Sequence, residues 1–340
     1  MNKLLAGTIA AAVMGAAGAL GPGAASAEDT TFNVGGAKVP GVPWYEYTYR
    51  AGSGYYPDAK RVLVDYPAGQ IQGRALADIL PPGSDLVTPS VGESVSIGSK
   101  SLDKAIRGDG DGRAIPVGLS EGAIVLDATQ NRLAKDPTAP PADKVTFTTF
   151  GDPSGQHGFG ESLMTTIFKP GTFIPLVDYT VPHPVDSQYD SVKVVGAYDG
   201  IADFPDRTDN LVSVANALMG AAFVHTPVAF TNPADVPPQN IKTTVNSRGA
   251  TTTTYLVPSK YLPLTLPLHY LGASDGVMAE LDAVLRPLVD AGYSRNDDPA
   301  TAPAAVFPTG MDPMDALEPA DRAKVDEALA QIRNILPPGI

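Results

Sequence analysis

Short apolar segments alternate with helical segments through the middle of the chain, and this alternation constrains the fold more than any other feature of the sequence. The strand-like segments are 61–66, 114–117, 144–150 and 191–198, and the helix-like segments are 94–106, 121–134 and 209–219. Strands that alternate with helices form a mostly parallel sheet, and right-handed crossovers place the helices on its faces. We therefore predict an α/β fold with helices on both faces, in which the loops at the carboxyl ends of the strands carry the chemistry.

One of these strand-to-helix junctions contains the motif Gly118-Leu119-Ser120-Glu121-Gly122. GxSxG between a strand and a helix is the pattern of a nucleophile elbow, in which a serine on a strained turn is exposed at the edge of an α/β-hydrolase sheet. Glycines two residues to either side are needed because side chains there would collide with the neighbouring strand and helix. The alternative is an ordinary turn in which Ser120 is the helix N-cap. The context favours the nucleophile, and we predict that Ser120 is catalytic.

An attacking serine also needs hydrogen-bond donors for the oxyanion that forms on the substrate. The elbow supplies one, the backbone N–H of Glu121, which lies at the positive end of the helix dipole. The second donor is expected in the loop after the first strand, which in this interpretation is the segment 66–70. Within that loop we select Ala68, and a plain turn that closes the strand is the alternative.

The chain has only four histidines, so a base for the serine has few candidates. In this fold the order along the chain is Ser, then Asp or Glu, then His. His157 and His183 precede the strand at 191–198 that should deliver the acid, which leaves His225 and His269. His225 follows a helix and leads into a loop, whereas His269 lies in an apolar stretch typical of packing. We predict that His225 is the general base, with a purely structural histidine as the alternative.

The acid is expected just after the strand at 191–198, where several carboxylates compete. Asp203 is favoured because an acid a few residues beyond the strand, closely followed by proline, lies in a loop that can reach back to the histidine. Asp199, at the strand end, is the alternative. Asp206 and Asp209 are expected to cap the following helix. The acid would hold the correct imidazole tautomer and stabilise the imidazolium.

The first 27 residues have the three parts of a secretory signal peptide. They are a basic start at Lys3, an apolar segment to about residue 20, and the small-residue cleavage site Ala25-Ser26-Ala27. We expect cleavage after Ala27 and export to the cell envelope or the medium. An uncleaved anchor is the alternative, because no later segment approaches the roughly 20 apolar residues of a membrane span.

Residues 28–340 are expected to form one domain, with a core at about 60–275 and C-terminal helices at about 276–336. The segment 242–257 has turn residues between Thr- and Val-rich arms, which predicts a β-hairpin that projects from the sheet as a lid or rim.

Composition excludes several classes of function. The net charge of −13 repels nucleic acid, and the absence of cysteine excludes thiol nucleophiles and thiolate metal sites. The acidic run from Arg107 to Arg113 lacks the length and the later Glu of a calcium loop, so a solvated turn is the better interpretation. We expect no metal and no cofactor.

Several strings in this chain occur together in one known family. They are the 118–122 elbow, Phe150-Gly151-Asp152-Pro153, Tyr198-Asp199-Gly200-Ile201-Ala202-Asp203-Phe204-Pro205, Asn210, Asn216-Ala217-Leu218-Met219-Gly220, Val224-His225 and Leu262-Pro263-Leu264. The chain resembles the PE-PPE-domain serine hydrolases of mycobacteria, which are similar to cutinases and to mycobacteriophage mycolylarabinogalactan esterases. The resemblance covers roughly residues 60–275.

This resemblance implies a Ser-Asp-His triad in which Ser120 and His225 carry over by motif position and the acid lies between Asp199 and Asp203. Leu119 and Glu121 replace the aromatic residue and the Gln that are common in the family's elbow. No PE or PPE helical module is expected before the domain, and a signal peptide joined to such a domain resembles exported acyltransferases that build acylated trehalose glycolipids. The implied reaction passes an acyl chain from the enzyme to a sugar hydroxyl. The alternatives are a secreted lipase or esterase and a non-catalytic lipid-binding protein of the envelope.

Overall fold

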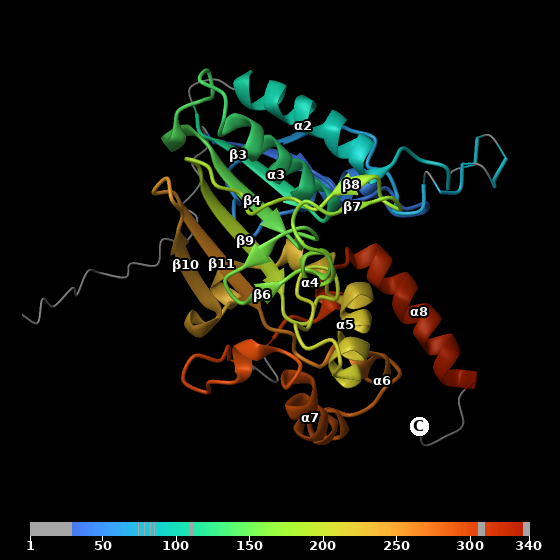
Figure 1. The fold of residues 1–340 in the computed structure, drawn as a ribbon. Coiled ribbons are helices and arrows are strands. Elements are labelled where there is room, and N and C mark those ends of the chain that lie inside the picture. The colour runs from blue at the N-terminus through green and yellow to red at the C-terminus, as the bar shows by residue number, and fades with distance from the viewer. Residues whose placement is uncertain are drawn as a thin grey trace, which may run out of the picture.

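The computed structural model describes residues 29–73, 75–77, 79–81, 83–84, 86–108, 112–304 and 310–335. Its centre is a seven-stranded sheet with the strand order β10-β11-β9-β4-β3-β1-β2 (Figure 1). These strands are β1 (Thr30–Val34), β2 (Lys60–Leu63), β3 (Ala114–Leu119), β4 (Thr146–Phe150), β9 (Asp190–Gly196), β10 (Ile241–Val245) and β11 (Thr251–Val257). Neighbouring strands are parallel except at the edge, where β10 and β11 are antiparallel. The predicted α/β-hydrolase class is confirmed, whereas the predicted signal peptide at 1–27 lies outside the described residues.

Two long helices cover one face of the sheet and lie side by side, α2 (Val91–Arg107) and α3 (Glu121–Leu133) (Figure 1). α2 begins at a capping box between Ser90 and Glu93, which satisfies two backbone N–H groups that a helix start leaves free. Apolar side chains of α2 and α3 pack with those of β1 and β4 in one core cluster. The opposite face is covered by the segment after α1 (Trp44–Arg50) and by the short helix η2 (Pro227–Phe230).

The first strand of the sheet is β1, which the sequence pattern did not predict. It lies between β3 and β2, and the strand expected at 61–66 is the edge strand β2. All five residues of β1 are buried although Thr30, Thr31 and Asn33 are polar. The Asn33 amide donates to the backbone carbonyls of Thr48 and Ala51, both at 2.9 Å. These contacts satisfy the amide nitrogen of Asn33, which helps a strand with little apolar periodicity to lie in the interior.

The hairpin at 242–257 does not project as a lid, and that expectation is wrong. β11 pairs in parallel with β9, and β10 extends the sheet as its outermost strand. The cause is the arm 251–257, whose residues Tyr255 and Val257 are buried in the same apolar cluster as Val192 and Val194 of β9. Burial of this face outweighs the polar character of the threonines before it.

A long insertion and a helical C-terminal region surround this sheet. The insertion after β4 contains two short hairpins, β5 (Gln156–His157) with β6 (Gly160–Glu161) and β7 (Phe173–Ile174) with β8 (Tyr179–Thr180), and the helix α4 (Leu163–Ile167). α5 (Leu211–Phe223) lies between β9 and β10 along the chain, and the C-terminal region after β11 contains α6 (Leu266–Tyr270), α7 (Asp275–Asp290) and α8 (Pro319–Ile335). Within the described residues no helix combines the length and apolarity that crossing a membrane requires.

A buried ion pair joins the C-terminal region to the loop after β9. Arg295, just after α7, contacts both carboxylate oxygens of Asp203, one of them at 2.8 Å. Asp203 is fully buried and its carboxylate also accepts the backbone N–H of Tyr198 at 2.8 Å. The ion pair therefore fixes the loop that follows β9 to a residue about 90 positions later in the chain.

We expect Arg295→Ala to lower the free energy of unfolding by about 3–5 kcal/mol, because it leaves the buried carboxylate of Asp203 without its counter-ion. The matched control is Arg207→Ala, which removes an exposed ion pair with Asp297 close to the same contact. That change should leave the free energy of unfolding almost unchanged, because solvent screens an exposed ion pair. Chemical denaturation of both variants measures the difference, and equal losses would contradict a special role for the buried pair.

Candidate active site

Ser120 occupies a strained turn between β3 and α3. Its φ of 55° and ψ of −119° lie in a region that residues with a side chain rarely adopt. A Cβ on Gly118 would lie 2.5 Å from the carbonyl oxygen of Gly122, and one on Gly122 would lie 2.1 Å from that of Val34. Both glycines are therefore required by the close approach of α3 to β3 and β1. The Ser120 side chain forms no cap hydrogen bond to α3, so the simple N-cap interpretation finds no support.

The hydroxyl of Ser120 contacts an imidazole, and the other side of that imidazole contacts a carboxylate. His225 Nε2 lies 2.8 Å from Ser120 Oγ, and His225 Nδ1 lies 2.8 Å from Asp199 Oδ2. Asp199 is fully buried and His225 is 6% exposed, whereas Ser120 is partly exposed. This order of contacts is that of a Ser-His-Asp triad, in which the imidazole can take the serine proton while the carboxylate holds the ring.

The loops that carry the triad candidates converge at the carboxyl ends of β3, β4 and β9. His225 follows α5 and lies against Gly151, where an added Cβ would approach the imidazole to 3.0 Å. Gly151 also has a φ of 60°, which favours glycine in the turn after β4. The absence of a side chain at this position also leaves room for the imidazole ring of His225. Asp199 lies three residues after the end of β9, and its Oδ1 accepts the backbone N–H of Ile201 at 2.9 Å.

The prediction that favoured Asp203 as the acid is corrected by these contacts, because the alternative, Asp199, is the carboxylate that touches His225. The chain turns tightly after β9, and the backbone N–H of Asp203 donates to the carbonyl of Asp199 at 2.7 Å. This turn directs the Asp203 side chain toward Arg295. A sequence window contains both aspartates but does not contain the distant arginine that distinguishes them.

Other residues that were weighed for the triad have different contacts. Burial lowers the pKa of His157 to about 4, and its Nε2 lies 3.6 Å from Asp203. His183 lines a cavity described below, and His269 packs on the ring of Tyr261 with 4.4 Å between centroids. The N-cap of α5 is Asn210, where Asp206 or Asp209 was expected.

The loop beside Ser120 follows β1 rather than β2. A Cβ on Gly36 would lie 3.0 Å from Ser120 Cβ and 3.6 Å from Ser120 Oγ. Ala68, the residue predicted to supply the second oxyanion donor, contacts this loop through its carbonyl, which accepts the N–H of Lys38 at 2.9 Å. The prediction took the strand at 61–66 as the first strand of the sheet, because β1 had not been recognised. Glu121 lies at the first position of α3, as expected.

Glu121 brings a carboxyl group into the interior next to the elbow. Its side chain is 4% exposed. Burial raises the pKa of Glu121 to about 9, and the nearby backbone N–H of Gly69 opposes this only in part. The side chain is therefore uncharged at neutral pH and places no negative charge beside the expected oxyanion.

No metal site accompanies the triad candidates. Within the described part of the chain, no three His, Asp or Glu side chains are grouped closely enough to hold a metal ion. Residues 109–111 of the acidic run at 107–113 lie outside the described residues.

The chain is similar to proteins of one mycobacterial family. The family model described as PE-PPE domain matches residues 57–294. Diacyltrehalose acyltransferase Chp2 of Mycobacterium tuberculosis (strain ATCC 25618 / H37Rv) is 57% identical over 297 residues, covering 86% of this chain and 82% of that protein. SL1278 acyltransferase Chp1 of the same strain is 40% identical over 313 residues, covering 89% and 73%. Esterase PE16, also from that strain, is 29% identical over 228 residues, covering 65% and 41%.

The raised pKa of Glu121 predicts a pH-dependent stability. Between about pH 4.5 and 9 the folded chain keeps a proton that the unfolded chain releases, so the free energy of unfolding falls as pH rises through this window. The slope is at most about 1.4 kcal/mol per pH unit. The amide of Glu121→Gln does not titrate, so this variant should not lose stability as the pH rises. The melting temperature of the variant minus that of the wild type should therefore increase from the acidic to the basic end of the window.

Thermal melts of both proteins across this range measure the effect. Glu46→Gln, at an exposed position of α1, is the control and should melt in parallel with the wild type. A constant difference between Glu121→Gln and the wild type at every pH would contradict the prediction.

Proposed function

The chain belongs to the PE-PPE domain family, and on that premise we propose that it is an exported serine acyltransferase that forms an acyl-enzyme on Ser120. The observation that carries this proposal is the pair of 2.8 Å contacts from His225 to Ser120 and to Asp199. Relatives at 57% and 40% identity are named acyltransferases, which supports transfer of the acyl group to an acceptor other than water.

In the first half of the reaction, Ser120 Oγ attacks the ester carbonyl carbon and His225 Nε2 takes the serine proton. Asp199 accepts the hydrogen bond from Nδ1, keeps the imidazole in that tautomer and stabilises the imidazolium. Backbone N–H groups of Glu121 and of Gly36, in place of Ala68, hold the oxyanion. The ester C–O bond then breaks, and the imidazolium returns its proton to the departing alkoxide.

In the second half, the acceptor hydroxyl gives its proton to His225 as it attacks the acyl carbonyl, and Ser120 leaves with the proton from the imidazolium. The acceptor is proposed to be a sugar hydroxyl of a trehalose-type glycolipid, since the relative at 57% identity is named a diacyltrehalose acyltransferase. The predicted signal peptide at 1–27 would deliver the enzyme to the cell envelope, where such a substrate or its membrane is accessible.

Hydrolysis of acyl esters is the second candidate function, and it is favoured by the similarity to a protein named as an esterase. Water then replaces the sugar in the second half of the reaction, and every catalytic residue stays the same. A non-catalytic lipid-binding protein is the third, and it would not need a serine hydroxyl within 2.8 Å of an imidazole.

The triad assignment predicts selective labelling by a fluorophosphonate, followed by intact-mass analysis of residues 28–340. The wild type should gain one adduct, and Ser120→Ala should gain none. His225→Ala should react much more slowly, and Asp199→Asn on the order of 10⁴-fold more slowly, because the imidazole loses its correct tautomer. Asp203→Asn is the matched control, since it disturbs the same loop and should lower the melting temperature while it still labels.

The labelling series has two contrary outcomes. A wild type that resists the reagent, beside a control esterase that reacts, would favour the lipid-binding protein. An Asp203→Asn variant that is folded but labels as slowly as Asp199→Asn would return the acid role to Asp203.

The choice between transfer and hydrolysis predicts a difference in products. With an acylated trehalose as the substrate, a transferase should form more highly acylated and less acylated trehalose in equal amounts, with little free fatty acid. Mass spectrometry of the lipid products measures this ratio, and Ser120→Ala controls for spontaneous hydrolysis. Free fatty acid as the dominant product, unchanged when acceptor glycolipid is added, would favour the esterase.

A further inference from the structure

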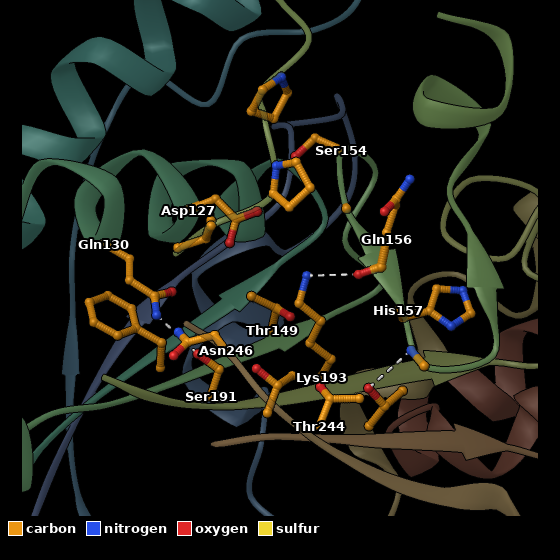
Figure 2. A pocket seen from close by; sticks show the side chains of 18 of the residues that line it. Asp127, Gln130, Thr149, Ser154, Gln156, His157, Ser191, Lys193, Thr244 and Asn246 are labelled. Atoms are coloured by element: carbon orange, nitrogen blue, oxygen red, sulfur yellow. Dashed lines mark hydrogen bonds between the residues drawn. The ribbon is translucent and has the colours of Figure 1, made fainter. Parts of the chain in front are cut away.

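A polar cavity of about 290 Å³ lies over the sheet, apart from the triad candidates (Figure 2). Its floor is formed by β4, β9, β10 and β11, its side by α3, and its roof by the insertion between β4 and β9. Its described lining residues do not include Ser120, His225 or Asp199. The cavity is near the lower end of the volumes that hold small-molecule ligands.

The floor of this cavity is polar in a place where the fold calls for apolar residues. Strands of a sheet covered on both faces are normally almost continuously apolar. The floor side chains are Thr149 of β4, Ser191 and Lys193 of β9, Thr244 of β10, and Thr252 and Thr254 of β11. On the opposite face of the same strands, Val192, Val194 and Tyr255 are buried in an apolar cluster. Polar side chains are therefore concentrated on the face that lines the cavity, although the lining also includes the apolar side chain of Phe147.

Charged groups inside the cavity nearly balance one another. Lys193 rises from the floor, and its Nζ lies 3.4 Å from Asp152 Oδ2 and donates to the backbone carbonyl of Gln156 at 3.2 Å (Figure 2). Asp127 approaches from α3 and is 5% exposed. Burial, together with the neighbouring charge of Asp152, raises the pKa of Asp127 to about 7. One ammonium therefore faces one carboxylate and a second carboxyl group that is readily protonated.

The near balance of positive and negative charge limits the class of ligand that the cavity can bind. A phosphate or carboxylate would meet the carboxyl group of Asp127, and the ammonium of Lys193 is already paired with the nearby Asp152, which opposes its binding. An acyl chain would form no hydrogen bonds with the hydroxyls of Thr149, Thr244 and Thr252 and would cover them from water, which is costly. A neutral ligand with many hydroxyls can donate to the carboxyl groups and accept from Lys193 at the same time.

Thr149 places at the cavity a hydroxyl that has no hydrogen-bond partner among the described residues. Its side chain is 4% exposed. Figure 2 shows Thr149 between Lys193 and the residues of α3, at the cavity. A buried hydroxyl without a partner is uncommon and destabilising, and a ligand hydroxyl at this point would satisfy it.

We propose that this cavity binds the sugar moiety of a glycolipid through hydrogen bonds to Thr149, Lys193 and Asp127. The identity of the sugar rests on the proposed function. Asp127 lies seven residues along α3 from Ser120, which is about 10 Å at the rise of a helix. The wall of the cavity at Ser154 begins three residues after Gly151, which touches His225. The cavity therefore adjoins the same two elements, α3 and the loop after β4, that position Ser120 and His225.

The test uses trehalose alone as the probe and a Ser120→Ala background, so that no turnover occurs. Ligand-observed NMR or calorimetry should detect trehalose binding to this protein, with no competition from inorganic phosphate or octanoate. Adding Thr149→Val, which keeps the shape and removes the hydroxyl, should weaken binding about 5- to 10-fold. The melting temperature should stay equal or rise, because the unpaired hydroxyl is gone.

The matched control is Thr166→Val, whose Oγ1 is also buried without a partner but lies outside the lining of the cavity. It should leave trehalose binding unchanged. Thr252→Val removes a second lining hydroxyl and should again weaken binding if Thr149→Val folds poorly. Binding that is absent in the Ser120→Ala protein, or that survives both lining substitutions, would overturn the inference.

These outcomes are independent of the proposed catalytic function. A protein that reacts with fluorophosphonate at Ser120 but does not bind trehalose overturns only the sugar site. A protein that binds trehalose through Thr149 but does not react at Ser120 overturns only the acyltransferase.

Discussion

The close packing of the start of α3 against β1 and β3 is the constraint on which the rest of the site depends. Neither Gly118 nor Gly122 has room for a Cβ, because the backbone of the neighbouring element occupies that position. This packing forces Ser120 into a positive φ and lifts its hydroxyl out of the sheet edge. It also brings the loop after β1 against the serine, so the expected nucleophile and oxyanion donors come from one rigid junction.

The acid end of the triad candidates is held in a different way. Asp199 lies in a loop, and loops lack the regular hydrogen bonds that position a residue on a strand or helix. Here the tight turn from Asp199 to Asp203 and the ion pair of Asp203 with Arg295 supply that rigidity. The C-terminal region is thus part of the support of the site, although it contributes no side chain to the triad candidates.

The face of the sheet that bears α3 is divided into two parts with different chemistry. Helices α2 and α3 cover β1, β3 and β4 with apolar side chains, whereas β9, β10 and β11 present hydroxyl and ammonium groups to a cavity. On the other face, Val192, Val194 and Tyr255 of β9 and β11 are buried in an apolar cluster. Apolar packing therefore occurs on one face of the sheet and, on the other face, beneath α2 and α3. The part of that second face formed by β9, β10 and β11 is left available for a polar ligand.

The sequence by itself determined the α/β class, the elbow at Ser120 and the choice of His225, because each depends on local pattern or on chain order. It did not reveal β1, in which the amide nitrogen of Asn33 donates to backbone carbonyls of a later segment. Because β1 was missing, the strand at 61–66 became the first strand of the prediction, and the loop of Ala68 was selected as the source of the second oxyanion donor. It also did not reveal that 251–257 enters the sheet, since that depends on a partner strand 60 residues earlier. Only the tertiary structure shows that Asp199, and not Asp203, contacts His225. The reason is that Asp203 pairs with the guanidinium of Arg295, which lies about 90 residues later in the chain.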